Sequence, residues 1–354
     1  LPIPSEEFFQ SIILPAGISF YTFQSMSYSI DLYFRKIHVE RNFLAFLNYV
    51  AYLPQLIAGP IERYHHLHPQ LEALALKRTI PQWKRGLDRL ALGIIQKLFI
   101  ADSCGFIVDT LLVDPHHLSF AMSWAIAIGF GMQIFYDFSA YSHMAIGISQ
   151  LVGVKLWDNF LAPYQAHNVR EFWHRWHITL STWFRDYVYI PLGGSRISLT
   201  RTLVNLMITF TISGLWHGAS WSFVLWGALH GTYLVVLVLL EKIFPAFRCP
   251  RPIGIMFTFV AVHYAWVLFR VSDLTVVTSL WKAMAGLHGL NRGLLSWPDI
   301  LFLAVVVLFT LVSPHAAQRP PGKNGYGETL LLWLGAFAAL GSSPELVQFI
   351  YFQF

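Results

Sequence analysis

Charged residues are scarce in this sequence. Only 12% of its 354 residues are Asp, Glu, Lys or Arg, whereas 55% are hydrophobic and 16% are aromatic. Soluble domains carry about 25% charged residues, so the composition excludes an ordinary soluble protein and predicts an all-α polytopic membrane protein. The net charge of +5 is typical of loops beside anionic lipid and does not favour nucleic-acid binding.

Several signatures of soluble enzymes are also absent. The two cysteines, Cys104 and Cys249, are far apart, which argues against a disulfide framework or a zinc ribbon. The sequence has no G-x-S-x-G, G-x-x-x-x-G-K-[ST], G-x-G-x-x-G or H-E-x-x-H motif. Hydride transfer and ATP hydrolysis therefore lose support, whereas a histidine-based transfer without a serine triad stays open.

The first residues, LPIP, lack both the basic region of a cleavable signal and an initiator Met. We therefore expect residues 1–354 to form a single membrane-embedded domain that belongs to the later part of a longer protein.

The longest stretch without charge runs from Thr202 to Leu240 and dominates the sequence. As one helix its 39 residues would extend roughly 58 Å, about twice the ~30 Å hydrocarbon core of a bilayer. The run must therefore turn back or break, and Gly214 and Gly218 predict the break around His217. Non-helical backbone at membrane depth is tolerated inside protein or beside a watery cavity, so we expect His217 to lie at such a cavity.

His217 is the leading candidate for chemistry, because an ionisable residue inside the membrane is by default a functional candidate. Burial favours the neutral imidazole, which is a suitable general base. A buried histidine that bonds to a neighbouring carbonyl between helices explains the position equally well. We interpret His230, further along the same run, as structural.

A second candidate region begins at Glu171 and reads EFWHRWHITLSTWFRDY. If it is helical, His174 and His177 share one face, with Arg170 and Arg185 nearby. Three interpretations remain: a weak metal site, an interfacial belt of aromatic and basic residues, or arginines that hold the phosphates of a nucleotide-like donor.

The remaining sequence contains further apolar segments. Residues 62–89 are basic and predict a cytoplasmic loop with a solvated cluster of His65, His66 and His68, whereas Asp114 to His117 form a turn on the outside. Residues 155–201 predict interfacial or re-entrant helices that cover one mouth of the cavity. A bend at Tyr136–His143, flanked by Asp137 and His143, separates two apolar stretches. The predicted spans are Phe8–Ile30, Asn42–Ile61, Leu90–Val113, Leu118–Tyr136, Ile253–Phe269, Ile300–Val312 and Leu330–Leu340. The residues Ile57 to Pro60 break the second of these segments, and because the loops on both sides of it are basic, a re-entrant segment is the alternative.

Six stretches of this sequence resemble the membrane-bound O-acyltransferase superfamily, and within it the branch that acetylates alginate. They are LPAGISFYTFQSMSYSIDLYF (14–34), LPQLIAGPI (53–61), GFGMQIFYDFSAYSHMAIG (129–147), NVREFWHRWHITLSTWFRDYVYIPLGG (168–194), SGLWHGASWSFVLWGALHG (213–231) and FIYFQF (349–354). This chain has His143 where Asp is more usual in the branch, and His174 where Arg is more usual.

The resemblance implies a multi-helix bundle around a central tunnel that brings an acyl donor to a buried histidine. The active-site histidine of the superfamily falls on His217, and its second functional position falls on His177. The donor would be acetyl-CoA or another acetyl thioester from the cytoplasm, with no bound cofactor and no metal. The acceptor would be an exported, alginate-like polysaccharide, reached with a periplasmic partner of the SGNH-hydrolase type, at a bacterial inner (cytoplasmic) membrane.

We therefore predict a membrane-bound O-acyltransferase in which His217 is the general base and His177 positions or polarises a reactant. Candidate substrate-binding residues are Trp216, His174, Arg175, Arg185 and Asp186. Two alternatives are a transporter or flippase whose histidine relays protons, and a non-catalytic membrane anchor for a secreted acetylation complex.

Overall fold

The computed structural model describes residues 17–115, 117–246, 248–291, 293–313 and 326–342, and every regular element in these ranges is helical. The predicted motif at 349–354 and the start of the segment from Phe8 lie outside them. The α-helices are α2 (Ile18–Tyr33), α3 (Phe43–Val50), α4 (Tyr64–Ala75), α5 (Trp83–Ile95), α6 (Asp102–Leu111), α7 (Phe120–Leu151), α8 (Val169–Arg175), α9 (Ile178–Phe184), α10 (Leu199–His217), α11 (Trp221–Ile243), α12 (Arg251–Arg270), α13 (Leu274–Met284), α14 (Trp297–Val312) and α15 (Tyr326–Ser342). Short 3₁₀ turns, η1 (Leu53–Gln55) and η3 (Pro163–Gln165), and π-helical stretches, η2 (Gln96–Ala101) and η4 (Arg185–Tyr189), complete the set.

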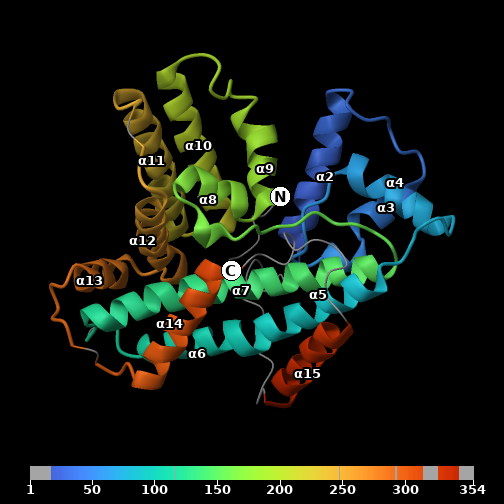
Figure 1. Ribbon diagram of the computed structural model, residues 1–354. Coiled ribbons are helices and arrows are strands. Elements are labelled where there is room, and N and C mark those ends of the chain that lie inside the picture. The colour runs from blue at the N-terminus through green and yellow to red at the C-terminus, as the bar shows by residue number, and fades with distance from the viewer. Residues whose placement is uncertain (1–16, 116, 247, 292, 314–325, 343–354) are drawn as a thin grey trace, which may run out of the picture.

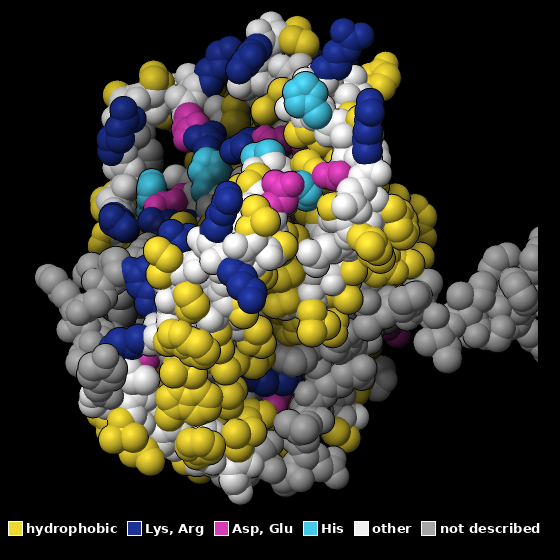
Figure 2. Space-filling model, turned by 90° about the vertical axis from the view of Figure 1, so that its right-hand side faces the viewer, with side chains coloured by type: hydrophobic (Ala, Val, Ile, Leu, Met, Phe, Trp, Pro, Cys, Tyr) yellow, Lys and Arg dark blue, Asp and Glu magenta, His cyan; other side chains and the backbone are white. Residues whose placement is uncertain are grey.

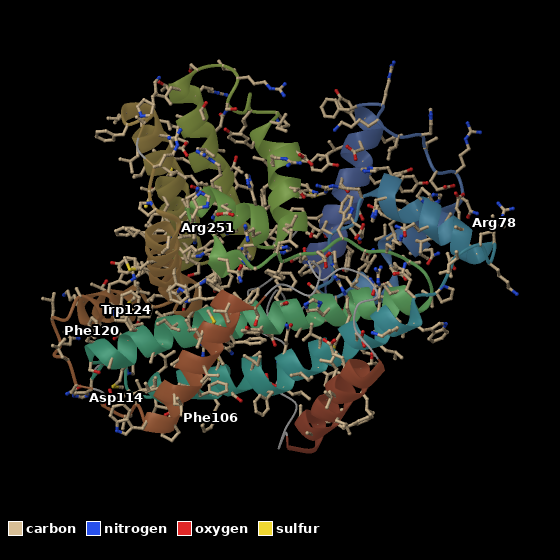
Figure 3. The ribbon with its side chains drawn as sticks, viewed as in Figure 1. Arg78, Phe106, Asp114, Phe120, Trp124 and Arg251 are labelled. Atoms are coloured by element: carbon tan, nitrogen blue, oxygen red, sulfur yellow. The ribbon has the colours of Figure 1, made fainter. Side chains whose placement is uncertain are left out.

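The helices form two groups above a long base (Figure 1). Helices α8 to α12 make one group, and α2 to α4 make the other. Helices α5, α6 and α7 run across beneath both groups, while α13, α14 and α15 pack against this base. Asp114 and Phe120 mark the end of the base where α6 leads into α7, and Arg78, after α4, lies at the other side of the molecule (Figure 3).

Three helices in the described part of the chain are long and apolar enough to cross a membrane: Trp83–Leu111, which joins α5, η2 and α6, together with α11 and α12. Helices α14 and α15 are apolar but shorter. The predicted segments around Leu90–Val113, Ile253–Phe269, Ile300–Val312 and Leu330–Leu340 are therefore helical.

Two predicted segments differ from the structure. Asn42–Ile61 is not a span, because α3 ends after eight residues and is followed by η1 and turns. The predicted bend at Tyr136–His143 is also wrong, because α7 continues without interruption through 32 residues. Its neighbour α5 approaches closely: a Cβ on Gly86 would lie 2.8 Å from the Gly147 carbonyl oxygen.

A buried ion cluster explains why α7 accommodates Asp137 without bending. The Lys97 ammonium lies 2.7 Å from the Asp137 carboxylate and 2.8 Å from that of Asp102. Residues five apart point in different directions on an α-helix, but the wider π-helical turns of η2 bring Lys97 and Asp102 toward one side. Lys97, Asp102 and Asp137 thus face the protein interior, as expected for ionisable groups at membrane depth.

We expect Lys97→Met to lower the free energy of unfolding by about 3–5 kcal/mol, because it leaves two buried carboxylates without their cation. Thermal unfolding of the detergent-solubilised protein measures this loss. The matched control on the same helix is Lys84→Met, because the Lys84–Asp88 pair is partly exposed and such pairs contribute about 0–1 kcal/mol. Equal stability losses in the two variants would contradict the prediction.

The histidines after Glu62 are not a solvated cluster, contrary to the sequence-based prediction. His66 pairs with the buried Glu62 carboxylate, and His68 is buried beside Glu40, 3.1 Å from its carboxylate. Only His65 is exposed. Helix formation explains the difference, because α4 turns His66 and His68 toward neighbouring carboxylates and leaves His65 on the outside.

Several exposed basic residues lie on the α2–α4 side of the molecule. In Figure 2, Lys, Arg and His side chains gather mainly in the upper part of this face, and hydrophobic side chains dominate below. Exposed basic residues on α2 to α4 and their connections are Arg35, Lys36, Arg41, Lys77 and Arg78. The protein therefore has a charged region distinct from its apolar surface.

The charge-free run from Thr202 to Leu240 turns back on itself, as predicted. Helix α10 ends at His217, and α11 begins at Trp221 after the short link that starts with Gly218. The two helices pack against each other along their length. His217 thus lies at the tip of a helical hairpin.

Two glycines allow this hairpin to close. A Cβ on Gly214 would lie 2.2 Å from the carbonyl oxygen of Phe223, and one on Gly227 would lie 2.2 Å from that of Phe210. Small residues permit such close approach between membrane helices. Gly214 therefore serves helix packing, and Gly218 is the glycine at which α10 ends.

Candidate functional site

His217 lies among aromatic rings at the tip of the hairpin. Its ring centroid is 4.5 Å from that of Trp216, 4.9 Å from that of Phe269 and 5.2 Å from that of Trp226. The residue nevertheless keeps part of its surface accessible and lines a cavity of about 680 Å³. The predicted cavity at the break is therefore present.

His177 lines the same cavity, although it is 40 positions earlier in the chain. Helix α8 ends at Arg175, so the prediction that His174 and His177 share a helical face is wrong. His177 has φ +41° and ψ +54°, and α9 starts at the next residue, Ile178. Both of its ring nitrogens are buried and lack a hydrogen-bond partner among the described residues. Buried polar atoms of this kind call for a partner, which a reactant or a water molecule in the cavity would supply.

The cavity follows α10 from Thr202 to His217, a distance of roughly 22 Å at ~1.5 Å per residue. Its inner end is aromatic, with Trp226, Trp266 and Phe269 around His217. The other end is polar and includes Arg170, His174, Arg185, Tyr189, Ser195 and Glu241. Because Arg185 is more than half exposed while Trp226 is buried, the polar end is the open one.

An ion pair connects two walls at this open end. Arg170 on α8 donates two hydrogen bonds of 2.8 Å to the Glu241 carboxylate on α11. His174 is close by, and partial burial together with Arg170 and Arg185 lowers its pKa below the usual value. The positive surroundings of His174 suit an anionic group better than a cationic one.

The other predicted substrate-binding residues do not line the cavity. Arg175 pairs with Glu171, and Asp186 pairs with Arg185. Trp216 packs directly on His217. Of the predicted set, His174 and Arg185 are therefore the two that reach the cavity, and the others support its walls.

His230 and the metal site considered for His174 and His177 differ from the histidines of the cavity in their roles. His230 is buried, accepts a hydrogen bond of 3.3 Å from the Trp173 indole and does not line the cavity. This placement agrees with its interpretation as structural. No group of three or more His, Cys, Asp or Glu side chains suited to a metal ion is found in the described ranges, and the metal alternative for His174 and His177 gains no support.

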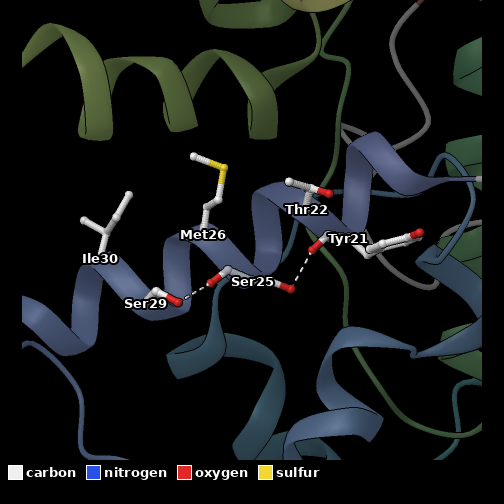
Figure 4. Close-up of a pocket in the computed structure, with 6 residues that line it drawn as sticks. All are labelled: Tyr21, Thr22, Ser25, Met26, Ser29 and Ile30. Carbon is white, nitrogen blue, oxygen red and sulfur yellow. Dashed lines mark hydrogen bonds between the residues drawn. The ribbon is translucent and has the colours of Figure 1, made fainter. Parts of the chain in front are cut away.

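A second hollow, of about 360 Å³, follows one face of α2 (Figure 4). The Ser25 hydroxyl donates to the Tyr21 carbonyl and the Ser29 hydroxyl to the Ser25 carbonyl, so both are already satisfied. The lining residues are Tyr21, Thr22, Ser25, Met26, Ser29 and Ile30. Among these described residues there is no histidine, acid or base to compare with the cavity at His217.

Among the residues that line the cavity and were not predicted from the sequence are Glu241, Trp266 and Phe269. Glu241 marks the end of an apolar run, and the other two belong to an apolar helix, α12. Nothing local in the sequence distinguishes them from ordinary boundary or core residues, because only the folded arrangement of α8, α11 and α12 brings them together.

This chain is similar to one protein family and to several known proteins. The profile of the membrane-bound O-acyltransferase family matches residues 36–276. The probable alginate O-acetylase AlgI of Azotobacter vinelandii is 42% identical over 84% of this chain and 60% of its own length. A protein of the same name from Pseudomonas putida is 35% identical over 97% of this chain and 76% of its length. The peptidoglycan O-acetyltransferase of Helicobacter pylori is 35% identical over 79% of this chain and 58% of its length. The chain thus spans about three fifths of the first and third of these relatives.

Proposed function

The chain belongs to the membrane-bound O-acyltransferase family, a family of multi-pass membrane proteins, and we propose that it transfers an acetyl group from a thioester donor toward an exported, alginate-like polysaccharide. The observation that carries this proposal is the single cavity that holds both His217 and His177 and opens at a polar end. We take residues 1–354 as one acyltransferase domain and this cavity as part of its central tunnel, with the short helices α8 and α9 covering the mouth.

In the proposed reaction His217 is the general base. Its neutral imidazole takes the proton of an acceptor hydroxyl while the hydroxyl oxygen attacks the thioester carbonyl. The carbon–sulfur bond then breaks, and the departing thiolate takes up the proton from His217. His177, whose two ring nitrogens have no hydrogen-bond partner in the described part of the chain, holds or polarises one of the two reactants.

The open end of the cavity fits an anionic donor such as acetyl-CoA. Arg170 and Arg185 provide guanidinium groups there, and guanidinium matches phosphate oxygens in geometry and charge. This end also adjoins the basic connector after α2, because the Lys36 ammonium lies 5.6 Å from the ring centroid of Tyr187 in η4. Basic loops favour the cytoplasmic side, so we assign donor entry to the cytoplasm of a bacterial inner membrane. Transfer to the exported polymer would use a periplasmic SGNH-hydrolase-like partner.

The test is acetyl transfer by the purified protein in proteoliposomes that contain a polysaccharide acceptor and the secreted partner. Labelled acetyl-CoA is supplied on one side, and both acetylated acceptor and free CoA are quantified. We expect the two products in equal amounts. Movement of label across the bilayer without release of CoA would favour a transporter. Undiminished acetylation by the partner alone would favour a non-catalytic anchor.

A further inference from the structure

The backbone at His177 adopts a conformation that needs external support. Its positive φ of +41° is in the left-handed region, which residues other than glycine adopt rarely. Such conformations cost of order 1–3 kcal/mol and persist only where the surroundings impose them. In addition, the first N–H groups of α9, which starts directly after His177, have no partners within the helix. Something outside α9 must hold this turn.

The group that holds it is Asn159, a buried residue in the connection between α7 and α8. Its backbone carbonyl accepts a hydrogen bond of 2.9 Å from the Ile178 N–H. Its side-chain Oδ1 accepts bonds from the Thr179 hydroxyl at 2.6 Å and from the Thr179 N–H at 3.4 Å. One residue thus binds both positions that follow His177.

The same side chain connects this turn to α7. The Nδ2 of Asn159 donates to the Ser142 hydroxyl at 3.2 Å. Ser142 lies one turn beyond Phe138 on α7, and the Phe138 ring contacts the His177 ring edge to face, with centroids 4.5 Å apart. Asn159 therefore fixes the start of α9 relative to the surface on which His177 packs. Thr179 adds a further link, because its hydroxyl accepts a bond of 3.0 Å from the Ile61 N–H.

We propose that Asn159 is a positioning residue for His177: its hydrogen bonds to Ile178, Thr179 and Ser142 hold the left-handed turn and keep the His177 ring in the cavity with His217. This inference rests on the proposed function, and it adds a residue that touches neither reactant. Asn159 acts through the backbone of the turn, so its removal changes the placement of His177 and leaves the donor-binding end of the cavity intact.

The experiment measures kcat and KM for the acetyl donor in Asn159→Ala and Thr179→Val. We expect kcat to fall roughly tenfold to a hundredfold, the effect of displacing a reacting group by about 1 Å, with KM for the donor within about twofold of wild type. Thr179→Ser keeps the hydroxyl and should restore kcat to near the wild-type value. Should Asn159→Ala fail to fold, the comparison of Thr179→Val with Thr179→Ser decides the question.

The matched control is Gln70→Ala. Gln70 holds the other end of the same connection through bonds of 2.8 and 3.0 Å to the backbone of Lys155, and it does not contact α9. We expect this variant to keep the wild-type kcat. A wild-type kcat in Asn159→Ala and Thr179→Val, a loss confined to KM, or an equal loss in Gln70→Ala would each overturn the inference. The His217→Ala variant in the same assay separates the two proposals. If it is inactive, a negative result for the Asn159 and Thr179 variants overturns only the role of Asn159. If it is active, the proposed function itself fails.

Discussion

The His217→Ala variant is expected to transfer acetyl groups 10²–10⁴-fold more slowly than the wild type, the typical contribution of general-base catalysis. This range corresponds to roughly 3–5 kcal/mol of activation free energy. Without the His217 imidazole, His177 is the other histidine beside the aromatic inner end of the cavity, and in the proposed reaction it positions or polarises a reactant and does not take the hydroxyl proton. Donor binding at Arg170 and Arg185 should persist, so the loss should appear in kcat.

The measurement is the labelled transfer assay at matched amounts of folded protein. His217→Gln serves as a second variant, because it retains polarity and most of the volume but is not a base, and it should be as inactive as His217→Ala. His230→Gln is the control, since His230 is a buried histidine on the same hairpin that lies outside the cavity. Near wild-type transfer by either His217 variant would refute the proposed role.

The Gly227→Leu variant is expected to yield no folded protein. A Cβ at this position would meet the Phe210 carbonyl oxygen at 2.2 Å, and because the obstacle is helix backbone it cannot move aside as a side chain does. Helices α10 and α11 would have to separate, which removes the contacts that close the hairpin around His217. Even Gly227→Ala should lower the free energy of unfolding by about 1–3 kcal/mol or more, as overpacked sites do.

Thermal unfolding in detergent, with the yield of monodisperse protein, measures both variants. The control is Gly341→Ala on α15, where an added Cβ meets no atom within 4 Å. Because alanine favours a helix over glycine by up to ~1 kcal/mol, this control should be neutral or slightly stabilising. A Gly227→Ala protein as stable as the wild type would show that the helices separate more easily than the structure implies.

The main features of the site could be predicted because they are local in sequence. The length of the run around His217, compared with the thickness of a bilayer, required a turn, and the structure confirms it. His177 was found through a recognisable motif. By contrast, Asn159 lies in the unremarkable stretch LWDNF, and its importance depends on α7, α9 and the connection between them meeting in space.

The errors in the predicted fold have physical causes as well. Hydropathy measures composition, so it could not show that Asn42–Ile61 divides into a short helix and turns. A charged residue in an apolar stretch suggested a bend near Asp137, whereas the partner that satisfies this charge, Lys97, lies 40 positions earlier on another helix. Pairings over such distances leave no periodic pattern in the sequence.

The distance between the two ends of the cavity sets a length requirement on its ligand. A donor that enters at the Thr202 end of the cavity would reach His217 only if its acyl group is carried on an arm of roughly 20 Å, the length of about fifteen residues of α10. A small acyl phosphate placed beside His217 would make no contact with the polar end of the cavity. A cavity of this length would select donors by the length of the arm that carries the acyl group as well as by their charge.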